Sequence, residues 1–329
     1  MNTSYLTHKR VLVTGGAGFI GSNLCEQLLK DDNEIVCVDN FITGKRENIA
    51  PFLTDKRFTL IEGDIRDISI CRKAVEGIDV VFQEAALGSV PRSINDPLTT
   101  TAINILGFAN VLYASVEAKV KRFVYAASSS TYGDSTQLPK VEHIIGKPLS
   151  PYAITKYVNE LYADNFAKLY GIQTIGLRYF NVFGRRQDPH GAYAAVISKF
   201  VIALLQHKQP VINGDGTYSR DFTYIDNVIQ ANELAATTTN AEAINQVFNV
   251  ACGQSTTLET LVQLLKNNLS AYDPEIARIE ALHGDFRAGD IPHSLASIEK
   301  IQRLLHYNPA FDMASGLKEA CKWYYENLK

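Results

Sequence analysis

The chain has 329 residues, which corresponds to one large domain or two at about 150 residues per domain. Its formal charge is 32 − 35 = −3, and the sequence has neither a basic block nor an acidic tail. This charge distribution argues against a protein that binds nucleic acid or an anionic membrane through a basic surface. No apolar run reaches the roughly 18 residues that span a bilayer, and the first ten residues lack the apolar stretch of a signal peptide, so we expect a cytoplasmic protein. Five cysteines without a CxxC pair predict reduced, core-packing thiols and no disulfide or zinc framework: Cys25, Cys37, Cys71, Cys252 and Cys321.

The first half of the chain alternates short β-branched runs with segments of helical apolar spacing. The expected strands are Arg10–Thr14, Glu34–Asp39, Phe58–Glu62, Asp79–Phe82, Arg122–Ala127 and Gln173–Tyr179. The expected helices are Phe19–Lys30, Ile68–Val75, Pro97–Ala118 and Tyr152–Tyr170. Such alternation predicts a doubly wound α/β fold, in which helices cover both faces of a parallel sheet.

This alternation ends after Tyr179. The Gly- and Pro-rich stretch Phe183–Gly191 is typical of a loop. Shorter elements follow at Ala192–Gln206, Val211–Ile212, Asn227–Ala236, Gln246–Val250, Leu258–Leu269, Leu295–Leu305 and Ser315–Asn327. We therefore expect two regions, residues 1–180 and 181–329, with the second, smaller α/β region over the carboxyl edge of the sheet, where ligands bind in open α/β sheets.

A glycine-rich turn joins the first expected strand to the first expected helix, and residues 16–21 match G-x-G-x-x-G. Such a turn lets backbone amides approach a pyrophosphate at a helix N-terminus, which carries partial positive charge. Asp39 ends the second strand 18 residues after Gly21, where a carboxylate accepts hydrogen bonds from an adenosine ribose and repels a 2′-phosphate. The pattern predicts a Rossmann domain that binds NAD rather than NADP. Asp64, after the third strand, flanks the adenine or caps its loop.

Three further residues suggest redox chemistry on an alcohol. Ser128 ends the fifth expected strand, and Tyr152 follows 24 residues later with Lys156 at i+4. That spacing puts the phenol and the ammonium on one helix face. A phenol has a pKa near about 10, so it serves as a base at neutral pH only when neighbouring positive charge favours the phenolate. By itself a Tyr-x-x-x-Lys pair is usually a solvated helix pair, but behind a dinucleotide turn it favours a catalytic site.

With these motifs the sequence resembles the extended short-chain dehydrogenase/reductase family, in its branch of nucleotide-sugar 4-epimerases. The resemblance covers residues 11–323 and includes the glycines, Asp39, Ser128, Tyr152 and Lys156. Three segments, Ala85–Ser93, Tyr179–Gln187 and Gly191–Val196, resemble sequence motifs of bacterial UDP-N-acetylglucosamine/UDP-N-acetylgalactosamine 4-epimerases of surface-polysaccharide pathways. Residues 1–180 would then bind NAD and residues 181–329 a nucleotide sugar.

The resemblance assigns binding residues by position. It implies that NAD is bound by Gly15, Gly18, Phe19, Ile20, Gly21, Asp39, Asn40, Phe41, Thr43, Gly44, Asp64, Ile65, Gln83, Ala85, Ala86, Asn104, Tyr152, Lys156, Tyr179 and Val182. It implies that a UDP-sugar is bound by Gly88, Ser89, Ser128, Ser129, Ser130, Tyr152, Asn181, Ala195, Val211, Asn213, Arg220, Arg287, Asp290 and Ser294. Arg220 and Arg287 would clamp the diphosphate with guanidinium forks. Ser294 would be a small wall residue of the sugar pocket, where family members restricted to non-acetylated hexoses carry a tyrosine; the alternative is that Ser294 caps an expected helix, Leu295–Leu305. The histidines lack ligand spacing, so no metal site is expected.

The expected reaction is 4-epimerisation of UDP-N-acetylglucosamine. Relatives that eliminate water or decarboxylate carry a carboxylate just after the catalytic Ser or Thr, where this chain has Ser129 and Ser130. One alternative substrate is a UDP-N-acetylhexosaminuronate, because Arg92 and Arg287 suit a carboxylate. A non-catalytic NAD-sensing module is the alternative from another class, although such proteins typically lack the tyrosine or the lysine.

The resemblance also implies a homodimer. The two long expected helices are apolar on more than one face. In this family the corresponding helices commonly form a four-helix seam between subunits. Burial inside one subunit is the alternative explanation.

Overall fold

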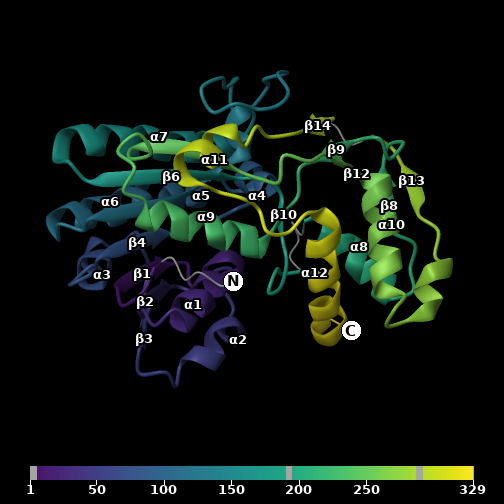
Figure 1. Cartoon of the computed structure of the whole chain (residues 1–329), viewed down its shortest axis with the longest axis horizontal. Coiled ribbons are helices and arrows are strands. Elements are labelled where there is room, and N and C mark those ends of the chain that lie inside the picture. Colours follow the sequence, from purple (N-terminus) through teal and green to yellow (C-terminus); the bar gives the residue numbers. More distant parts are fainter. Residues whose placement is uncertain (1–5, 190–194, 287–291, 329) are drawn as a thin grey trace.

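A seven-stranded parallel sheet forms the centre of the computed structural model, which describes residues 6–189, 195–286 and 292–328 (Figure 1). The strand order is β11-β6-β5-β4-β1-β2-β3. The strands are β1 (Arg10–Thr14), β2 (Glu34–Asp39), β3 (Phe58–Glu62), β4 (Val80–Gln83), β5 (Arg122–Ser128), β6 (Gln173–Tyr179) and β11 (Gln246–Val250). The predicted doubly wound α/β fold is confirmed. Six of these strands lie within two residues of their expected bounds, because buried parallel strands form continuous apolar runs.

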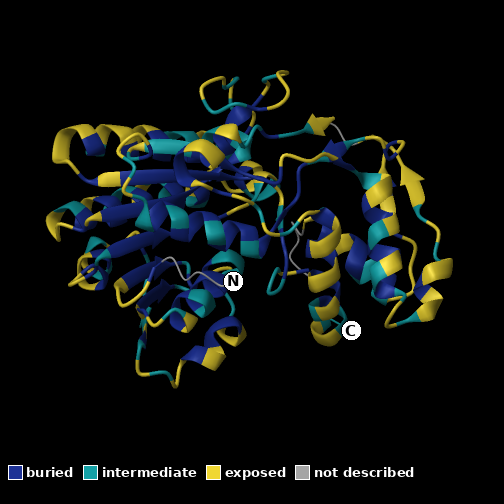
Figure 2. Cartoon of the chain, in the orientation of Figure 1, coloured by how far each residue is buried: buried dark blue, intermediate teal, exposed yellow. Residues whose placement is uncertain are grey.

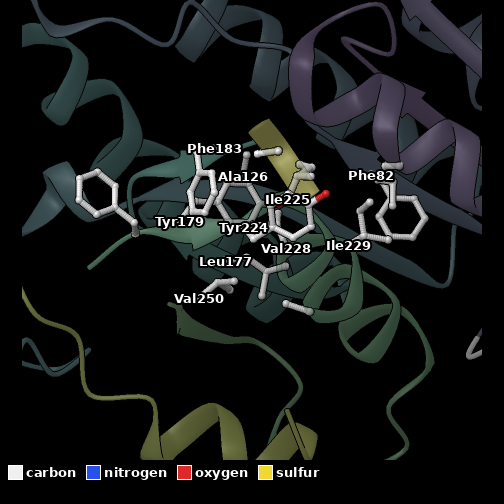
Figure 3. Close-up of a cluster of buried hydrophobic side chains, with 14 of the residues drawn as sticks. Phe82, Ala126, Leu177, Tyr179, Phe183, Tyr224, Ile225, Val228, Ile229 and Val250 are labelled. Atoms are coloured by element: carbon white, nitrogen blue, oxygen red, sulfur yellow. The ribbon is translucent and has the colours of Figure 1, made fainter. Parts of the chain in front are cut away.

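Helices cover both faces of the sheet. The helices on one face are α3 (Ile68–Ala74), α6 (Phe108–Glu117) and α7 (Pro151–Tyr170). Those on the other are α1 (Phe19–Lys30) and α9 (Ile225–Thr237). Figure 3 shows the core on the second face, where Ile225, Val228 and Ile229 of α9 meet Phe82, Ala126 and Leu177 of three strands. This packing holds the carboxyl ends of the strands in a fixed arrangement.

The seventh strand comes from beyond residue 180. Residues 246–250 pair in parallel with β6, with Val250 opposite Tyr179. Helix α9, which precedes this strand, also packs on the sheet. The sheet and its covering helices therefore draw on sequence from both expected regions, because the chain returns to the sheet after leaving it at Tyr179.

The expected helix at Pro97–Ala118 is interrupted. It consists of α5 (Pro97–Thr101), a π-helical turn η2 (Ala102–Gly107) and α6. Gly107 lies against Ile65, where a Cβ atom would approach the isoleucine side chain to 2.6 Å. By length and composition Pro97–Glu117 could cross a membrane, with a mean hydropathy of 1.2, although 50% of that window is buried inside the protein. The interruption matters for the site, since π turns place side chains out of helical register.

The rest of the second region stands beside the sheet, to the right in Figure 1. It contains α8 (Val196–Leu205), α10 (Leu258–Leu269), α12 (Met313–Leu328), β8 (Val211–Asn213) paired with β13 (Leu282–Gly284), and β9 (Ser219–Arg220) between β12 (Thr256–Thr257) and β14 (His293–Ser294). The remaining short elements are α2 (Arg46–Ile49), η1 (Ala50–Phe52), α4 (Val90–Asn95), η3 (Ser129–Tyr132), β7 (Val182–Phe183), β10 (Thr223–Tyr224), η4 (Pro274–Arg278) and α11 (Glu299–Leu305).

One helix boundary was predicted wrongly. We expected a helix from Leu295, but α11 begins at Glu299, and Ser294 belongs to strand β14. The backbone carbonyl of Leu295 accepts a hydrogen bond from the Lys140 amide at 2.7 Å, and the Ser297 amide donates to the Lys140 carbonyl at 2.9 Å. These strand-like bonds to a distant segment take up the residues that apolar spacing alone assigned to the helix.

The five cysteines are buried and unpaired. Although they are far apart in sequence, the thiols of Cys25 and Cys37 meet beneath Gly16. A Cβ atom at residue 16 would overlap the Cys37 sulfur. The expectation that the cysteines pack in the core is confirmed.

Candidate active site

A cavity of about 450 Å³ opens at the carboxyl edge of the sheet. Its walls come from the turns after β1, β2, β4, β5 and β6 and from the start of α7. The residues on its lining that the sequence singled out are Gly15, Gly18, Phe19, Ile20, Gly21, Asp39, Asn40, Thr43, Ile65, Ala85, Ala86, Gly88, Ser128, Ser129, Tyr152, Lys156, Tyr179, Asn181 and Val182. The parallel sheet thus brings most of the expected cofactor residues and the three expected catalytic residues to one place.

The glycine turn forms one wall of this cavity. Gly15 has φ +67°, and a Cβ atom there would lie 2.8 Å from the backbone of Ala85. At Gly21 a Cβ atom would overlap the carbonyl oxygen of Gly15. No described side chain caps the first turn of α1, whose N-cap is Gly18. The backbone amides of that turn therefore face the cavity without a side chain in front of them, which suits a pyrophosphate.

Asp39 lies at the other end of the turn. Its carboxylate accepts hydrogen bonds from the amides of Ala17 at 2.9 Å and Phe41 at 2.8 Å. Burial raises the pKa of this carboxyl, and the backbone amides oppose that shift. Each carboxylate oxygen keeps a second lone pair for a ribose hydroxyl. Asp39 therefore both shapes the glycine turn and presents negative charge to the cavity, so the chain fits NAD at this place.

Ser128, Tyr152 and Lys156 converge deeper in the cavity. Ser150 caps α7 by accepting from the Ala153 amide, and the Tyr152 amide donates to the Ser93 hydroxyl at 3.0 Å. One turn later, the Lys156 ammonium donates to the carbonyl of Ala126 at 2.7 Å. The contacts at the start of α7 therefore position Tyr152, and the contact with strand β5 positions Lys156.

The hydroxyl groups of Ser130, Ser128 and Tyr152 are connected by hydrogen bonds. The Ser130 hydroxyl donates to the Ser128 hydroxyl at 2.9 Å, and the Ser130 amide approaches the same oxygen at 3.1 Å. With its lone pairs used in this way, Ser128 has its own proton to donate, and its hydrogen bond with Tyr152 lowers the pKa of the phenol. Ser130, which the resemblance assigns to the substrate, orients Ser128 and is not among the residues that line this cavity.

The groups of the chain do not by themselves favour the phenolate. Burial raises the pKa of Tyr152 above its ordinary value, the Ser128 hydrogen bond opposes this shift, and the charge of Glu84 adds to it. Burial lowers the pKa of Lys156, which is 4% exposed. We expected both the Lys156 ammonium and an oxidised nicotinamide to favour the phenolate; Lys156 is not among the causes of the Tyr152 pKa shift, so a bound nicotinamide would have to supply the positive charge.

Glu84 was missed by the sequence analysis. It directly follows β4, lines the cavity, and accepts a hydrogen bond from the Tyr179 hydroxyl at 2.8 Å. A carboxylate at the carboxyl end of a parallel strand, beside Ala85 and Ala86, was the available signal.

Several expected cofactor residues act one layer behind the cavity. Gln83 accepts from the Thr14 hydroxyl at 2.6 Å and donates to the Ala85 carbonyl at 3.1 Å. Asn104, on the π turn, accepts from the Leu87 amide at 2.8 Å and so holds a lining residue. The Asp64 carboxylate is bonded to Arg66 and Asn40, which favours the loop-capping alternative. Of the described cofactor candidates, the following lie outside this cavity's lining: Phe41, Gly44, Asp64, Gln83 and Asn104.

The expected substrate residues are spread over a longer surface. A second cavity of about 550 Å³ shares Gly18, Phe19 and Gly88 with the first and extends to Gly44, Ser89 and Ala195. Further out, Val211 and Asn213 lie on β8, and pairing of β9 with β14 sets Arg220 opposite Ser294. Arg287 and Asp290 lie outside the described residues. The structure thus joins Arg220 and Ser294, which are 74 positions apart, but leaves them outside the lining of both cavities.

The chain is similar in sequence to a known protein family and to known enzymes. The sequence profile of the NAD dependent epimerase/dehydratase family matches residues 11–251. A UDP-glucose 4-epimerase of Mycolicibacterium smegmatis is 32% identical over 318 residues, which cover 96% of this chain and 98% of the relative.

Solved structures of UDP-sugar 4-epimerases also resemble this chain. A UDP-N-acetylglucosamine 4-epimerase from Methanobrevibacter ruminantium M1, in complex with UDP-N-acetylmuramic acid, matches with a TM-score of 0.90 and 38% identity over 98% of this chain and 99% of that one. A UDP-glucuronic acid 4-epimerase from Bacillus cereus, in complex with UDP-glucuronic acid and NAD, matches with a TM-score of 0.86 and 31% identity over 97% of this chain and 100% of that one.

Proposed function

The chain belongs to the NAD dependent epimerase/dehydratase family, and from this premise we propose that it is a UDP-N-acetylglucosamine/UDP-N-acetylgalactosamine 4-epimerase that supplies precursors of surface polysaccharide in the cytoplasm. Its relatives are 4-epimerases of UDP-sugars, so the chain is an NAD-dependent isomerase of that substrate class. The observation that carries the proposal is the convergence of Ser128, Tyr152 and Lys156 in the cavity behind the glycine turn.

Each of these side chains has a role that its contacts support. A bound NAD would supply a reversible hydride acceptor for C4 of the sugar. Tyr152 takes the proton of the 4-hydroxyl and gives it back, so the net reaction is an inversion without oxidation. Ser128 donates to the reacting oxygen, since Ser130 already occupies its acceptor side. Lys156 holds the nicotinamide ribose and adds positive charge beside the phenol.

Residues next to Ser128 separate epimerisation from elimination. Elimination of water needs an additional acid–base group close to the sugar. The positions after Ser128 hold Ser129 and Ser130, which form the short helix η3 and have no carboxylate. We therefore propose that the 4-keto sugar turns about its diphosphate link within the pocket and is reduced again.

The N-acetyl preference rests on Ser294. A small residue at this position leaves room for an acetamide group, and the methanogen relative of 38% identity is a UDP-N-acetylglucosamine 4-epimerase. The direct experiment is NMR of UDP-N-acetylglucosamine mixed with the enzyme and no added reductant. We expect the axial 4-hydroxyl isomer to appear, and an unchanged spectrum would contradict the proposal and favour an NAD-sensing module.

A uronate is the second candidate substrate. Arg92 lines the second cavity, where a guanidinium suits a carboxylate, and the Bacillus cereus relative is a UDP-glucuronic acid 4-epimerase. The same NMR experiment with the UDP-N-acetylhexosaminuronate distinguishes the two substrates.

Asp39 gives a test of the cofactor. Replacing it by asparagine, Asp39→Asn, keeps an acceptor for the Ala17 amide but removes the charge that repels a 2′-phosphate. We expect the preference for NAD over NADP to fall by about tenfold, equivalent to about 1.4 kcal/mol, as measured by the two dissociation constants.

Asp64→Asn is the matched control, because this carboxylate is bonded to Arg66 outside the cavity. We expect its cofactor preference to equal that of the wild type. An unchanged preference in Asp39→Asn as well would refute the role of Asp39.

We also propose a homodimer. The outer faces of α5, η2 and α7 expose large apolar side chains, among them Leu98 (82% exposed), Leu106 (51%) and Leu161 (51%), and exposed residues follow α6 and α7 in Figure 2. Ile154 and Leu161 are seven residues apart, so they share one face of α7. Large apolar side chains that gather on neighbouring elements and stay exposed favour a subunit interface.

The dimer can be tested with one charge. Leu161→Glu buries a carboxylate in the proposed interface, and we expect the dimer dissociation constant to rise about tenfold or more in sedimentation velocity. Leu53→Glu introduces the same charge at a leucine that is 52% exposed beside η1, and it should leave the dimer intact. A monomeric wild-type protein would contradict the proposal.

A further inference from the structure

A chain of hydrogen bonds joins two residues of the first cavity's lining, Glu84 and Tyr179, to helix α9. The Tyr179 hydroxyl donates to Glu84 at 2.8 Å and accepts from the Asn232 amide at 2.9 Å. Asn232 is itself anchored, because its amide also donates to the Val228 carbonyl at 2.9 Å on α9. Glu84 is thus held in one orientation by groups from β6 and α9.

The charged neighbours of Glu84 come from α7. The Lys156 ammonium interacts electrostatically with the Glu84 carboxylate, and the negative charge of Glu84 also acts on Tyr152. Behind Lys156 stands Glu160, whose carboxylate is engaged by Arg178 at 2.7 and 2.8 Å. From β5 the cavity floor receives neutral groups, the Ala126 carbonyl and the Ser128 hydroxyl. Glu84 is therefore a negative group that lines the same cavity as Lys156 and acts on its ammonium.

The proposed mechanism leaves this carboxylate without a role. A buried ammonium is unstable unless a negative group compensates it. Burial lowers the pKa of Lys156, and the charges of Glu84 and Glu160 oppose that shift. Since Glu160 is neutralised by Arg178, the compensation depends chiefly on Glu84. The same burial raises the pKa of Glu84, while the Tyr179 hydrogen bond favours its ionised form.

We propose that Glu84 is a positioning residue that acts through Lys156: its carboxylate is the counter-charge that keeps the Lys156 amine protonated inside the cavity. This role rests on the proposed function, because a protonated Lys156 matters for the base Tyr152. Tyr179, itself held by Asn232, keeps the carboxylate in place and favours its ionised form against the burial that raises the pKa of Glu84 to about 7. The arrangement balances two effects, since Glu84 preserves the positive charge of Lys156 and at the same time opposes the ionisation of Tyr152.

Glu84→Gln separates this role from a merely structural one. The amide oxygen of glutamine still accepts the hydrogen bond from Tyr179, so the anchoring of the floor is kept while the charge is lost. A residue that only packs or anchors Tyr179 would leave the titration of Lys156 unchanged.

The titration of Lys156 can be followed directly by NMR of protein labelled with ¹³C at the lysine ε-carbon, with the Lys156 signal assigned by its loss in Lys156→Arg. We expect the midpoint to fall by about one pH unit in Glu84→Gln, the size typical of losing one nearby counter-charge. The alkaline limb of the pH profile of kcat/KM should move down by a similar amount. Glu84→Asp keeps the charge and should bring the midpoint back towards the wild-type value.

Glu233→Gln is the matched control, because Glu233 is a buried glutamate of α9 whose electrostatic partner is Asp31 rather than Lys156. We expect no change of the Lys156 midpoint there. If Glu84→Gln does not fold, Tyr179→Phe removes the donor that favours the ionised carboxylate, and the midpoint should again fall. A midpoint equal to wild type in the folded variants overturns the role of Glu84. The NMR titration needs no turnover, so it decides this role even if the wild-type protein converts no UDP-sugar and the proposed function fails.

Discussion

Tyr152→Phe should lower kcat by about 10²–10⁴-fold, the cost typical of losing a general base. The change removes only the ionisable oxygen, because the backbone amide of residue 152 still donates to Ser93 and the helix cap at Ser150 is untouched. KM should change much less than kcat, since the lost interaction belongs to the transition state. The measurement is the steady-state rate of 4-epimer formation with NAD bound.

A second phenol on the same helix provides the control. Tyr157 follows five positions later and does not belong to the described lining of the cavity. Tyr157→Phe should keep kcat close to wild type. If Tyr152→Phe retains kcat within about threefold of the wild type, Tyr152 is not the base, since such a change is far smaller than general-base catalysis supplies.

Ser294→Tyr should lower kcat/KM for UDP-N-acetylglucosamine by roughly 5- to 150-fold and largely spare UDP-glucose. A phenol at a wall of the proposed sugar pocket costs about 1–3 kcal/mol in overpacking, and the substrate with the extra acetyl atoms bears most of it. The strand pairing that sets Ser294 opposite Arg220 supports this expectation, because Arg220 is the proposed diphosphate clamp. The measurement is the ratio of kcat/KM for the two substrates.

The fold removes the competing explanation of Ser294 as a helix cap. Helix α11 begins at Glu299, five residues later, and its first amide approaches the Ser297 hydroxyl at 3.4 Å. Ser297→Tyr is therefore the matched control, which should lower the melting temperature and leave the substrate ratio unchanged. An unchanged ratio in Ser294→Tyr would show that this serine is not a wall of the sugar pocket.

Features that depend on neighbouring residues were predictable from the sequence. Strands β1, β2, β3 and β6 and helix α1 have the expected bounds, because each is a short run whose own periodicity and flanking glycines specify it. The glycine turn and the Tyr152/Lys156 pair are local in the same sense. Their spacing along one turn or one helix face already determines that the groups lie together.

Features that depend on distant pairing were decided by the tertiary structure. The last strand of the sheet returns from residues 246–250. Hydrogen bonds of Leu295 and Ser297 to Lys140 take the place of the first turn of an expected helix. The π turn η2 places Asn104 beside Leu87, and its Gly107 lies against Ile65 in the loop after β3. Short segments have too little intrinsic preference to choose between strand and helix, so hydrogen bonds to remote segments decide.

In the candidate site, too, some features follow from the local sequence and others only from the tertiary structure. The sequence by itself determined the three catalytic candidates and the NAD turn, because parallel strands bring their carboxyl ends to one edge whatever the details of packing. Only the tertiary structure showed that Ser130 acts behind Ser128, that Arg220 lies beside Ser294, and that Glu84 lines one cavity with Lys156. The physical reason is that burial and charge compensation depend on which side chains meet across the fold, and spacing along the chain does not contain that information.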